Sequence, residues 1–291
     1  MPQETVVVQV PRAEHEALRA RLQSGEFEWR SAPHAAFSVK GDGVVATLYL
    51  SGKLVVQGST ARMFLARWTG QAPPAAAPED AIARTDEPTV GADETGKGDY
   101  FGPLVVAAVR LEPEQAVRLA ELGVADSKKL TDARAMRLAT GLRELPHAVE
   151  LLHPAEYNEV YPRYRGLNPM LADLHAKAIA QVAQDADRVL VDQFADEKVM
   201  RAATSHLTLK LEQAHRAERN VAVAAASVLA RAEFLLALRE LSARWDVDLR
   251  KGAGAPTDEA ALEFVRQHGR DALGEVAKLH FKNTGKVEAR L

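Results

Sequence analysis

The sequence predicts an α/β protein with a smaller α+β module at its N-terminal end. Short alternating strands fill the first 70 residues, a Pro- and Ala-rich stretch follows them, and further along a long helix runs directly into a β-branched strand. A helix that leads into a parallel strand is typical of an α/β sheet. With 291 residues, the chain is long enough for two unequal domains.

Residues 1–70 are expected to form the small module. Its strand-like runs are TVVVQV, HAAFSVKG, VVATLYL and KLVVQGS, and its helix-like runs are RAEHEALRARLQ and TARMFLARW. The alternation in VVATLYL is typical of a sheet with one buried face. The next stretch, residues 71–87, has prolines and little apolar periodicity, which predicts a semi-rigid linker.

Residues 88–291 are expected to form the larger domain, a mixed sheet with flanking helices. PTVGAD and PLVVAAVRL flank a glycine loop as in an antiparallel hairpin, and HAVELL, DRVLVDQF and LTLKLEQ are further strand candidates. Helices are expected at 115–122, at 132–145, in the run NVAVAAASVLARAEFLLALREL and after the loop RKGAGAP. Another begins near GLNPMLADLHAKAI, with Asn168 as its N-cap and Pro169 at its first position.

Composition excludes several classes of protein. There is no cysteine, so disulfide scaffolds and cysteine-based zinc sites are excluded, and a cytoplasmic location is expected. The N-terminus lacks the pattern of a signal peptide, and the most apolar run, Val221–Leu238, contains Arg231 and Glu233, so no membrane partner is expected. The net charge of −3 does not by itself decide for or against a nucleic-acid partner, and a monomer is expected.

The stretch GADETGKGDYFGP contains the GxxxxGK spacing of a phosphate-binding P-loop. A P-loop needs a hydroxyl after its lysine, but this position is Gly98. Asp93 and Glu94 would also repel phosphates inside such a loop. Adjacent acids before a Gly-x-Gly turn are better suited to bind a divalent cation beside a loop that exposes its backbone.

Four acids are candidates for one metal site. Asp93 and Glu94 end one predicted strand, Asp192 ends another, and Glu218 lies just before a helix start. If the two strands are parallel neighbours, their acids emerge at the same edge of the sheet. Four carboxylates together require cations, and two Mg²⁺ or Mn²⁺ ions would meet that need in phosphodiester hydrolysis. The alternative is a set of solvated surface charges, with Asp192 capping the next helix.

Several ordered motifs resemble the type 3 ribonucleases H, the ribonuclease HIII family, over nearly the whole chain. The matching runs are DETGKGDYFGPLVVAAV, DSKKL, YNEVYPRYRGLNPMLADLHAKAI, VDQF, AERNVAVAAASVLAR and KLHFKNT. ATLYLSGKLVVQG is similar to the family's substrate-binding module, which resembles the TATA-box-binding protein fold. The resemblance implies a ribonuclease H-like fold and endonucleolytic cleavage of RNA in RNA/DNA hybrids, giving 5′-phosphate and 3′-hydroxyl ends. Its four catalytic and metal-binding acids fall on Asp93, Glu94, Asp192 and Glu218.

Further residues are candidates for substrate binding. Glycines in the loop would let the backbone approach the minor groove of a hybrid, where it can read a 2′-hydroxyl. Polar residues of DSKKL and KLHFKNT suit the phosphate backbone, with a helix-capping serine and an ordinary C-terminal tail as the alternatives. The full set is Gly96, Lys97, Gly98, Tyr100, Ser127, Lys128, Asn168, His280, Lys282, Asn283 and Thr284. His175, on an apolar helix, is expected to be a core histidine, and Tyr49, Lys53 and Gln57 are expected on a duplex-binding sheet.

Two other functions remain open at this point. A type 2 ribonuclease H would cut at a single ribonucleotide in duplex DNA. Type 2 enzymes have Gly-Arg-Gly where type 3 enzymes commonly have Gly-Thr-Gly, and Gly96-Lys97-Gly98 of this chain departs from both. A non-catalytic protein would bind hybrids without cutting them. The intact set of four acids favours an enzyme over this second alternative.

Overall fold

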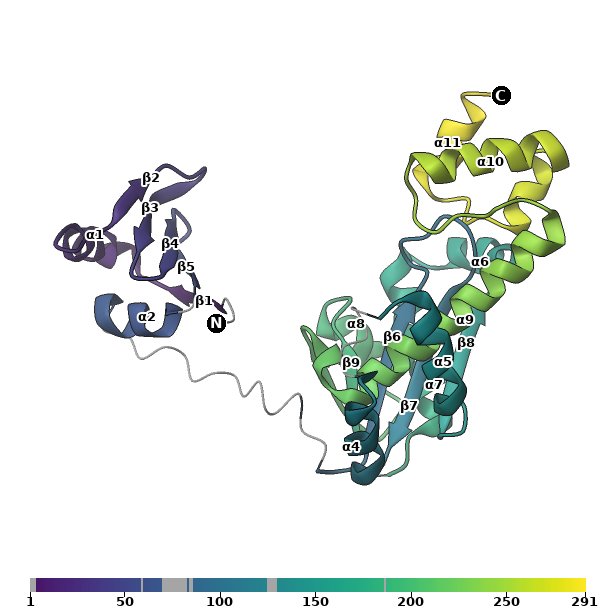
Figure 1. Ribbon diagram of the computed structural model, residues 1–291, viewed down its shortest axis with the longest axis horizontal. Helices are drawn as coiled ribbons and strands as arrows, with labels where there is room; N and C mark the ends of the chain where they lie inside the picture. Colours follow the sequence, from purple (N-terminus) through teal and green to yellow (C-terminus); the bar gives the residue numbers. More distant parts are fainter. Residues whose placement is uncertain (1–3, 59, 70–82, 84–85, 125–129, 186) are drawn as a thin grey trace. The chain divides into compact units, whose positions relative to one another are not determined.

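The computed structural model describes residues 4–58, 60–69, 83, 86–124, 130–185 and 187–291, except for the side chains of residues 4, 5 and 62. By its internal contacts the chain divides into two compact units, Met1–Ala81 and Ile82–Leu291 (Figure 1). Most of the stretch expected to be a linker, residues 71–87, lies outside the described residues.

The N-terminal unit is a five-stranded antiparallel sheet with the strand order β1-β5-β4-β3-β2. The strands are β1 (Glu4–Gln9), β2 (Glu28–Arg30), β3 (Ala35–Gly41), β4 (Val44–Tyr49) and β5 (Lys53–Gly58). The helices are a short 3₁₀ turn η1 (Arg12–Glu14), α1 (His15–Gln23) and α2 (Ala61–Thr69).

One face of this sheet is covered by the two helices. Leu18 and Leu22 of α1 and Phe64 of α2 share a buried cluster with alternate residues of the strands, such as Val39 and Leu48. The intervening strand residues lie on the opposite face, where most are half-buried or exposed, although Ser38, whose hydroxyl contacts that of Thr47, is buried. The predicted sheet with one buried face is thus confirmed.

The larger unit contains a mixed sheet with the order β10-β9-β6-β7-β8. The strands are β6 (Thr89–Thr95), β7 (Leu104–Leu111), β8 (His147–Leu152), β9 (Arg188–Asp192) and β10 (Lys210–Ala214). β7 is antiparallel to β6 and β8, whereas β9 is parallel to both β6 and β10. The predicted hairpin and the predicted parallel neighbour therefore both occur.

Helices flank this sheet and continue beyond its end (Figure 1). The α-helices are α4 (Pro113–Glu121), α5 (Asp132–Leu142), α6 (Pro154–Val160), α7 (Leu167–Val182), α8 (Glu197–Ala203), α9 (Val221–Trp245), α10 (Ala255–His268) and α11 (Lys282–Glu288). Short 3₁₀ helices are η3 (Tyr161–Arg163), η4 (Ala217–Arg219) and η5 (Asp271–Glu275).

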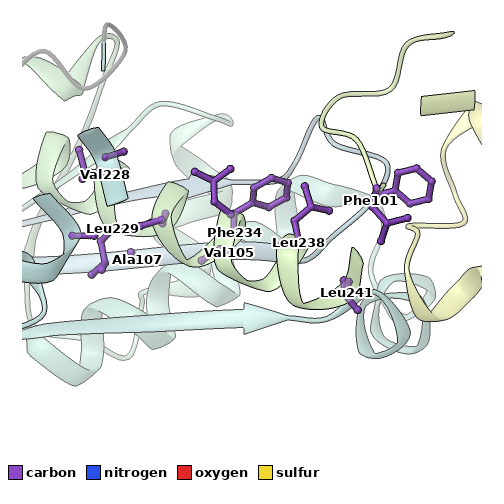
Figure 2. Packing of buried hydrophobic residues seen from close by; sticks show 14 of the residues in the cluster. Phe101, Val105, Ala107, Val228, Leu229, Phe234, Leu238 and Leu241 are labelled. Atoms are coloured by element: carbon purple, nitrogen blue, oxygen red, sulfur yellow. The ribbon is translucent and has the colours of Figure 1, made fainter. Parts of the chain in front are cut away.

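Strand β7 is buried on both faces, because helices cover the sheet on both sides. Val105 and Ala107 pack in a cluster with α9 and α5, and the alternate residues Val106 and Ala108 pack in a second cluster with α7. Figure 2 shows the first cluster, in which Val105 and Ala107 lie beside Leu229 and Phe234 of α9. Full burial explains why β7 reads as a continuous apolar run.

Helix α9 is the central core helix of this unit. By length and composition it could span a membrane, but 72% of its apolar window is buried inside the fold, as a core helix requires. Its first turn comes so close to β6 that a Cβ atom on Gly91 would lie 2.1 Å from the backbone of Ala222 and Val223. Gly91 is therefore required for this contact.

The structure differs from the sequence-based prediction at several elements. β2, α6, α8 and α11 were not expected, because each has seven residues or fewer and little periodicity. Helix α7 begins at Leu167 with Gly166 as its N-cap, so the expected capping by Asn168 is wrong. Gly166 has a φ of 110°, a backbone conformation that glycine adopts readily.

Replacing Gly91 by alanine should destabilise the larger unit by about 1 to 3 kcal/mol or more, because the new methyl group must push α9 away from β6. Urea unfolding followed by circular dichroism measures this change. Gly141→Ala is the matched control. No atom lies within 4 Å of a Cβ at this position near the end of α5, so the variant should unfold at the same or a higher urea concentration. Equal midpoints for Gly91→Ala and wild type would contradict the close approach.

Candidate active site

The acids of β6 and β9 lie at the same edge of the sheet. The parallel register pairs Ala92 with Val191, one residue before Asp93 and Asp192. Asp192 in turn pairs with Ala214 at the end of β10, and Glu218 follows in η4. The structure thus places all four predicted acids at or just beyond the carboxyl ends of three neighbouring parallel strands.

Asp192 fixes the segment that carries Glu218. Its Oδ1 accepts a hydrogen bond of 2.9 Å from the backbone N–H of Ala217. Asn220 then caps α9, since its Oδ1 accepts from the N–H of Ala222 at 2.9 Å. Glu218 is half-buried between these two anchored points.

Asp93 lies in an environment that disfavours its charge. Burial, followed by the charge of Glu94, raises the pKa of Asp93 to about 6, and the charge of Asp192 adds to this. A side-chain hydrogen bond with Ser227 of α9 and the bond of 2.8 Å from the backbone N–H of Glu94 act in the opposite direction. The two aspartates and Glu94 are therefore close enough to repel one another.

Both carboxylate oxygens of Glu94 have partners. Nε2 of His175 lies 3.1 Å from Oε2, and Nζ of Lys97 lies 2.5 Å from Oε1. Burial raises the pKa of Glu94, but these two neighbours outweigh burial and lower it. For Lys97, burial lowers the pKa, but the charges of Glu94, Asp93 and Asp192 outweigh it and leave the pKa raised.

The donor set suits a divalent cation. Among the residues that the structure describes, no three histidine, aspartate or glutamate side chains are arranged to hold one metal ion. Protein donors contact Glu94 and Asp192 in this arrangement. Carboxylates are the ligands that Mg²⁺ and Mn²⁺ prefer, and burial together with the neighbouring charge of Glu94 raises the pKa of Asp93, an effect that a bound cation would oppose. Lys97 supplies positive charge at Glu94 in this arrangement.

A cavity of about 180 Å³ adjoins the acids on the side of Ser227. Arg231 and Lys251 contribute to its lining, and both donate hydrogen bonds of 2.5 Å to the carboxylate of Asp132. Their positive charges are therefore already partly balanced within the protein.

The glycine loop is a tight turn rather than a P-loop, because Asp93 and Glu94 still belong to strand β6. Gly96 has a φ of +95°, and a Cβ there would lie 2.2 Å from the carbonyl oxygen of Pro103. Gly98 is exposed, with no atom within 4 Å of a Cβ position. Lys278 anchors the loop, because its buried Nζ donates hydrogen bonds to the carbonyl of Gly102 at 2.5 Å and to that of Pro103 at 3.3 Å. Burial lowers the pKa of Lys278 to about 7.

Two predicted substrate-binding residues prove to be internal contacts. Tyr100 is completely buried, and its hydroxyl is 3.0 Å from Oγ1 of Thr284, so its ring cannot stack on a substrate in this structure. Asn283 is buried and donates to the carbonyl of Ala253 and to Asp258. These two predictions are corrected, whereas the half-buried Thr284 stays a prediction. The contacts fasten α11 to the loops beside the site.

The remaining predicted positions are exposed or not described. Asn168 and Lys282 are exposed. His280 is exposed and stacks on Tyr161, with ring centroids 4.2 Å apart. Ser127 and Lys128 lie outside the described residues.

Sequence reasoning missed two residues that contact the acids. Ser227 lies within a run of small residues in α9 that indicates only close packing. His175 was expected to be a satisfied core histidine, and it is completely buried in α7, but its partner Glu94 is 81 positions away in the chain. The polar residue within each apolar helix was the available signal, and the fold was needed to identify its partner.

Known proteins share this architecture. The family model described as ribonuclease HII matches residues 90–284, and a ribonuclease HIII of Protochlamydia amoebophila is 40% identical over 92% of this chain and 91% of its own length. The chain belongs to the ribonuclease HII and HIII family. It is therefore a ribonuclease H, and the predicted mixed α/β fold is confirmed.

Further ribonuclease HIII relatives cover both units. The protein of Geobacillus kaustophilus is 37% identical over 97% of this chain and 96% of its own. The crystal structure of Bst-RNase HIII in complex with Mn²⁺ is 33% identical, covers 99% of both chains and has a TM-score of 0.69. Residues 5–79 match a separate family model, described as a domain of unknown function.

Asp93→Asn should stabilise the metal-free protein at neutral pH. The raised pKa means that folding disfavours the charged form, so wild-type stability falls as pH rises from about 4 through about 6. At pH 7 in EDTA, Asp93→Asn should have a free energy of unfolding about 1 to 3 kcal/mol higher than that of wild type, and this difference between the two proteins should shrink toward pH 4. Urea unfolding across this pH range measures it.

Asp271→Asn, at an exposed carboxylate, is the control and should change stability by less than about 0.5 kcal/mol at each pH. If Asp93→Asn is no more stable than wild type at pH 7, or if its added stability is equally large at pH 4, the crowded environment of Asp93 is contradicted.

Proposed function

We propose that this ribonuclease H cleaves the RNA strand of RNA/DNA hybrids by two-metal-ion hydrolysis, giving 5′-phosphate and 3′-hydroxyl ends. The main supporting observation is the convergence of Asp93, Glu94 and Asp192 at one sheet edge, where burial and the neighbouring negative charges raise the pKa of Asp93. The solved relative in complex with Mn²⁺ supports a divalent cation. Mg²⁺ suits the same oxygen donors.

In this proposal the four acids hold the ions. Asp93 and Asp192, on adjacent strands, would bind the same ion, and Glu94 and Glu218 would complete the set of ligands. Lys97 would then leave Oε1 of Glu94, because its side chain is 51% exposed and sits in a turn. Released from Glu94, it would be available to contact a phosphate of the substrate.

When bound, the ions would activate a water molecule and stabilise the departing oxygen. The water oxygen forms the new bond to phosphorus while the bond from phosphorus to O3′ breaks. One proton of the water ends on O3′, and the phosphate remains on the 5′ side of the next nucleotide. The chain contributes by fixing its carboxylates on rigid strand ends, and Gly98 leaves the loop open for a nucleic-acid backbone.

The N-terminal unit would supply affinity for the hybrid. Tyr49, Lys53 and Gln57 lie on the sheet face opposite to α1 and α2, since they alternate with the buried Leu48, Leu54 and Val56. Within the N-terminal unit, most residues of this face are half-buried or exposed and only some are apolar, which suits a contact with a duplex backbone. Lys53, one of its basic residues, is exposed.

Asp192→Asn should abolish cleavage of a labelled RNA/DNA hybrid in Mg²⁺ or Mn²⁺, lowering kcat by about 10³-fold or more while hybrid binding is retained. Wild type should cut the hybrid and lose this activity in EDTA. Asp196→Asn is the matched control, because Asp196 is an exposed N-cap residue that asparagine can replace, and it should retain full activity.

The same assay separates the two alternatives. Cutting of a duplex with a single embedded ribonucleotide as efficiently as the hybrid would show type 2 specificity. Tight binding of the hybrid by wild type without metal-dependent cutting would mean that the chain is a binding protein only. Either result would contradict the proposed substrate or reaction.

Lys53→Ala should weaken hybrid binding at low salt and reduce the slope of log Kd against log salt concentration by about 1, with kcat unchanged, because one phosphate contact is lost. Binding titrations at several salt concentrations measure this. Arg21→Ala removes the same charge from α1, on the helical side of the module, and should leave the slope unchanged. Equal slopes for Lys53→Ala and wild type would rule out Lys53 as a phosphate contact.

A further inference from the structure

His175 is a polar side chain in the middle of the apolar helix α7. It is completely buried, and the Glu94 side chain that it contacts is only 3% exposed. A carboxylate can only accept hydrogen bonds, so Nε2 must carry a hydrogen and donate it to Oε2 across 3.1 Å. The contact joins α7 to the end of β6.

The other ring nitrogen makes no competing contact. Nδ1 is buried and has no hydrogen-bond partner among the described residues. Among these residues, the hydrogen bonding of the ring is therefore directed at Glu94 alone.

The ring is also fixed in orientation. It stacks on Phe194 with centroids 4.9 Å apart and planes 11° apart. Phe194 follows Asp192 by two residues, so His175 contacts segments from both strands that carry acids. A rotation of the imidazole would break this stacking together with the hydrogen bond.

The two partners of Glu94 differ in mobility. Lys97 reaches Oε1 from a turn with a side chain that is 51% exposed, whereas His175 reaches Oε2 with a side chain that is 0% exposed. An incoming cation can displace the Lys97 side chain into solvent, whereas the buried His175 side chain has no solvent to move into. Oε2 therefore keeps its hydrogen bond with His175, and Oε1 can be freed to bind a cation.

We propose that His175 is a positioning residue for metal binding: it holds the Glu94 carboxylate through Oε2 so that Oε1 faces the ion. This inference rests on the proposed function, in which Glu94 is a metal ligand. Groups that orient metal ligands in this way commonly contribute a factor of about 10 to 100 to metal affinity. Hybrid recognition does not involve His175, because the ring is inaccessible.

The test is a titration of Mn²⁺ into the full chain by calorimetry, without substrate. His175→Phe keeps an aromatic ring against Phe194 but has no donor for Glu94, and it should bind Mn²⁺ about 10- to 100-fold more weakly. His175→Gln offers an amide N–H at similar reach and should recover most of the affinity. In hybrid cleavage, His175→Phe should need more Mn²⁺ for half-maximal rate, with KM for the hybrid unchanged.

His147→Phe is the matched control, because His147, at the start of β8, contacts the carbonyl of Leu145 through Nδ1, and the Mn²⁺ affinity of this variant should equal that of wild type. If His175→Phe binds Mn²⁺ as tightly as wild type, or if His175→Phe and His175→Gln bind it equally weakly, the inference is overturned and the proposed function is left intact. Wild type that binds no Mn²⁺ and cuts no hybrid would overturn both.

Thermal unfolding in EDTA shows whether His175→Phe is folded. If it is unfolded, we compare His175→Gln with His175→Asn, because the shorter asparagine side chain cannot reach Glu94. Tighter Mn²⁺ binding by the glutamine variant is then the expected result, and equal binding by the two would overturn the inference.

Discussion

The parallel pairing of β6 and β9 is the constraint on which the site depends. Its register places Asp93 and Asp192 side by side at one sheet edge, although 99 positions separate them in the chain. A slip of one residue would turn one of the two side chains to the other face of the sheet. The register is protected because both faces are buried: α9 packs on one side and α7 on the other. The hydrophobic core thus determines which acids meet.

Bringing these acids together opposes folding, and the fold compensates with donors from each surrounding layer. α9 supplies Ser227 to Asp93, α7 supplies His175 to Glu94, and η4 supplies the backbone N–H of Ala217 to Asp192. The two helices that bury the sheet therefore also orient the carboxylates. Packing changes in α7 or α9 are coupled to the geometry of the site, even where the changed residue lies inside the core.

The sequence predicted the long elements because their signals are local. β-branched runs marked β7 and β9, and the acids expected at strand ends do lie at one edge of the sheet. Short elements such as α8 and α11 were missed, since seven residues give too little periodicity. Tyr100 and Asn283 were misassigned because their burial depends on α11 folding back onto the loops. Contacts such as His175 with Glu94 depend on tertiary pairing that no local pattern encodes.

The buried Lys278 joins the loop after β6 to a segment 176 positions further along the chain. During translation the strand with Asp93 and Glu94 leaves the ribosome long before this lysine does. A nascent chain can thus pair β6 with β7 while the turn beyond them still lacks its internal anchor. The loop is consequently completed late in biosynthesis, after Lys278 has been synthesised. The strand with Asp93 and Glu94 can therefore form before the surface around it is assembled.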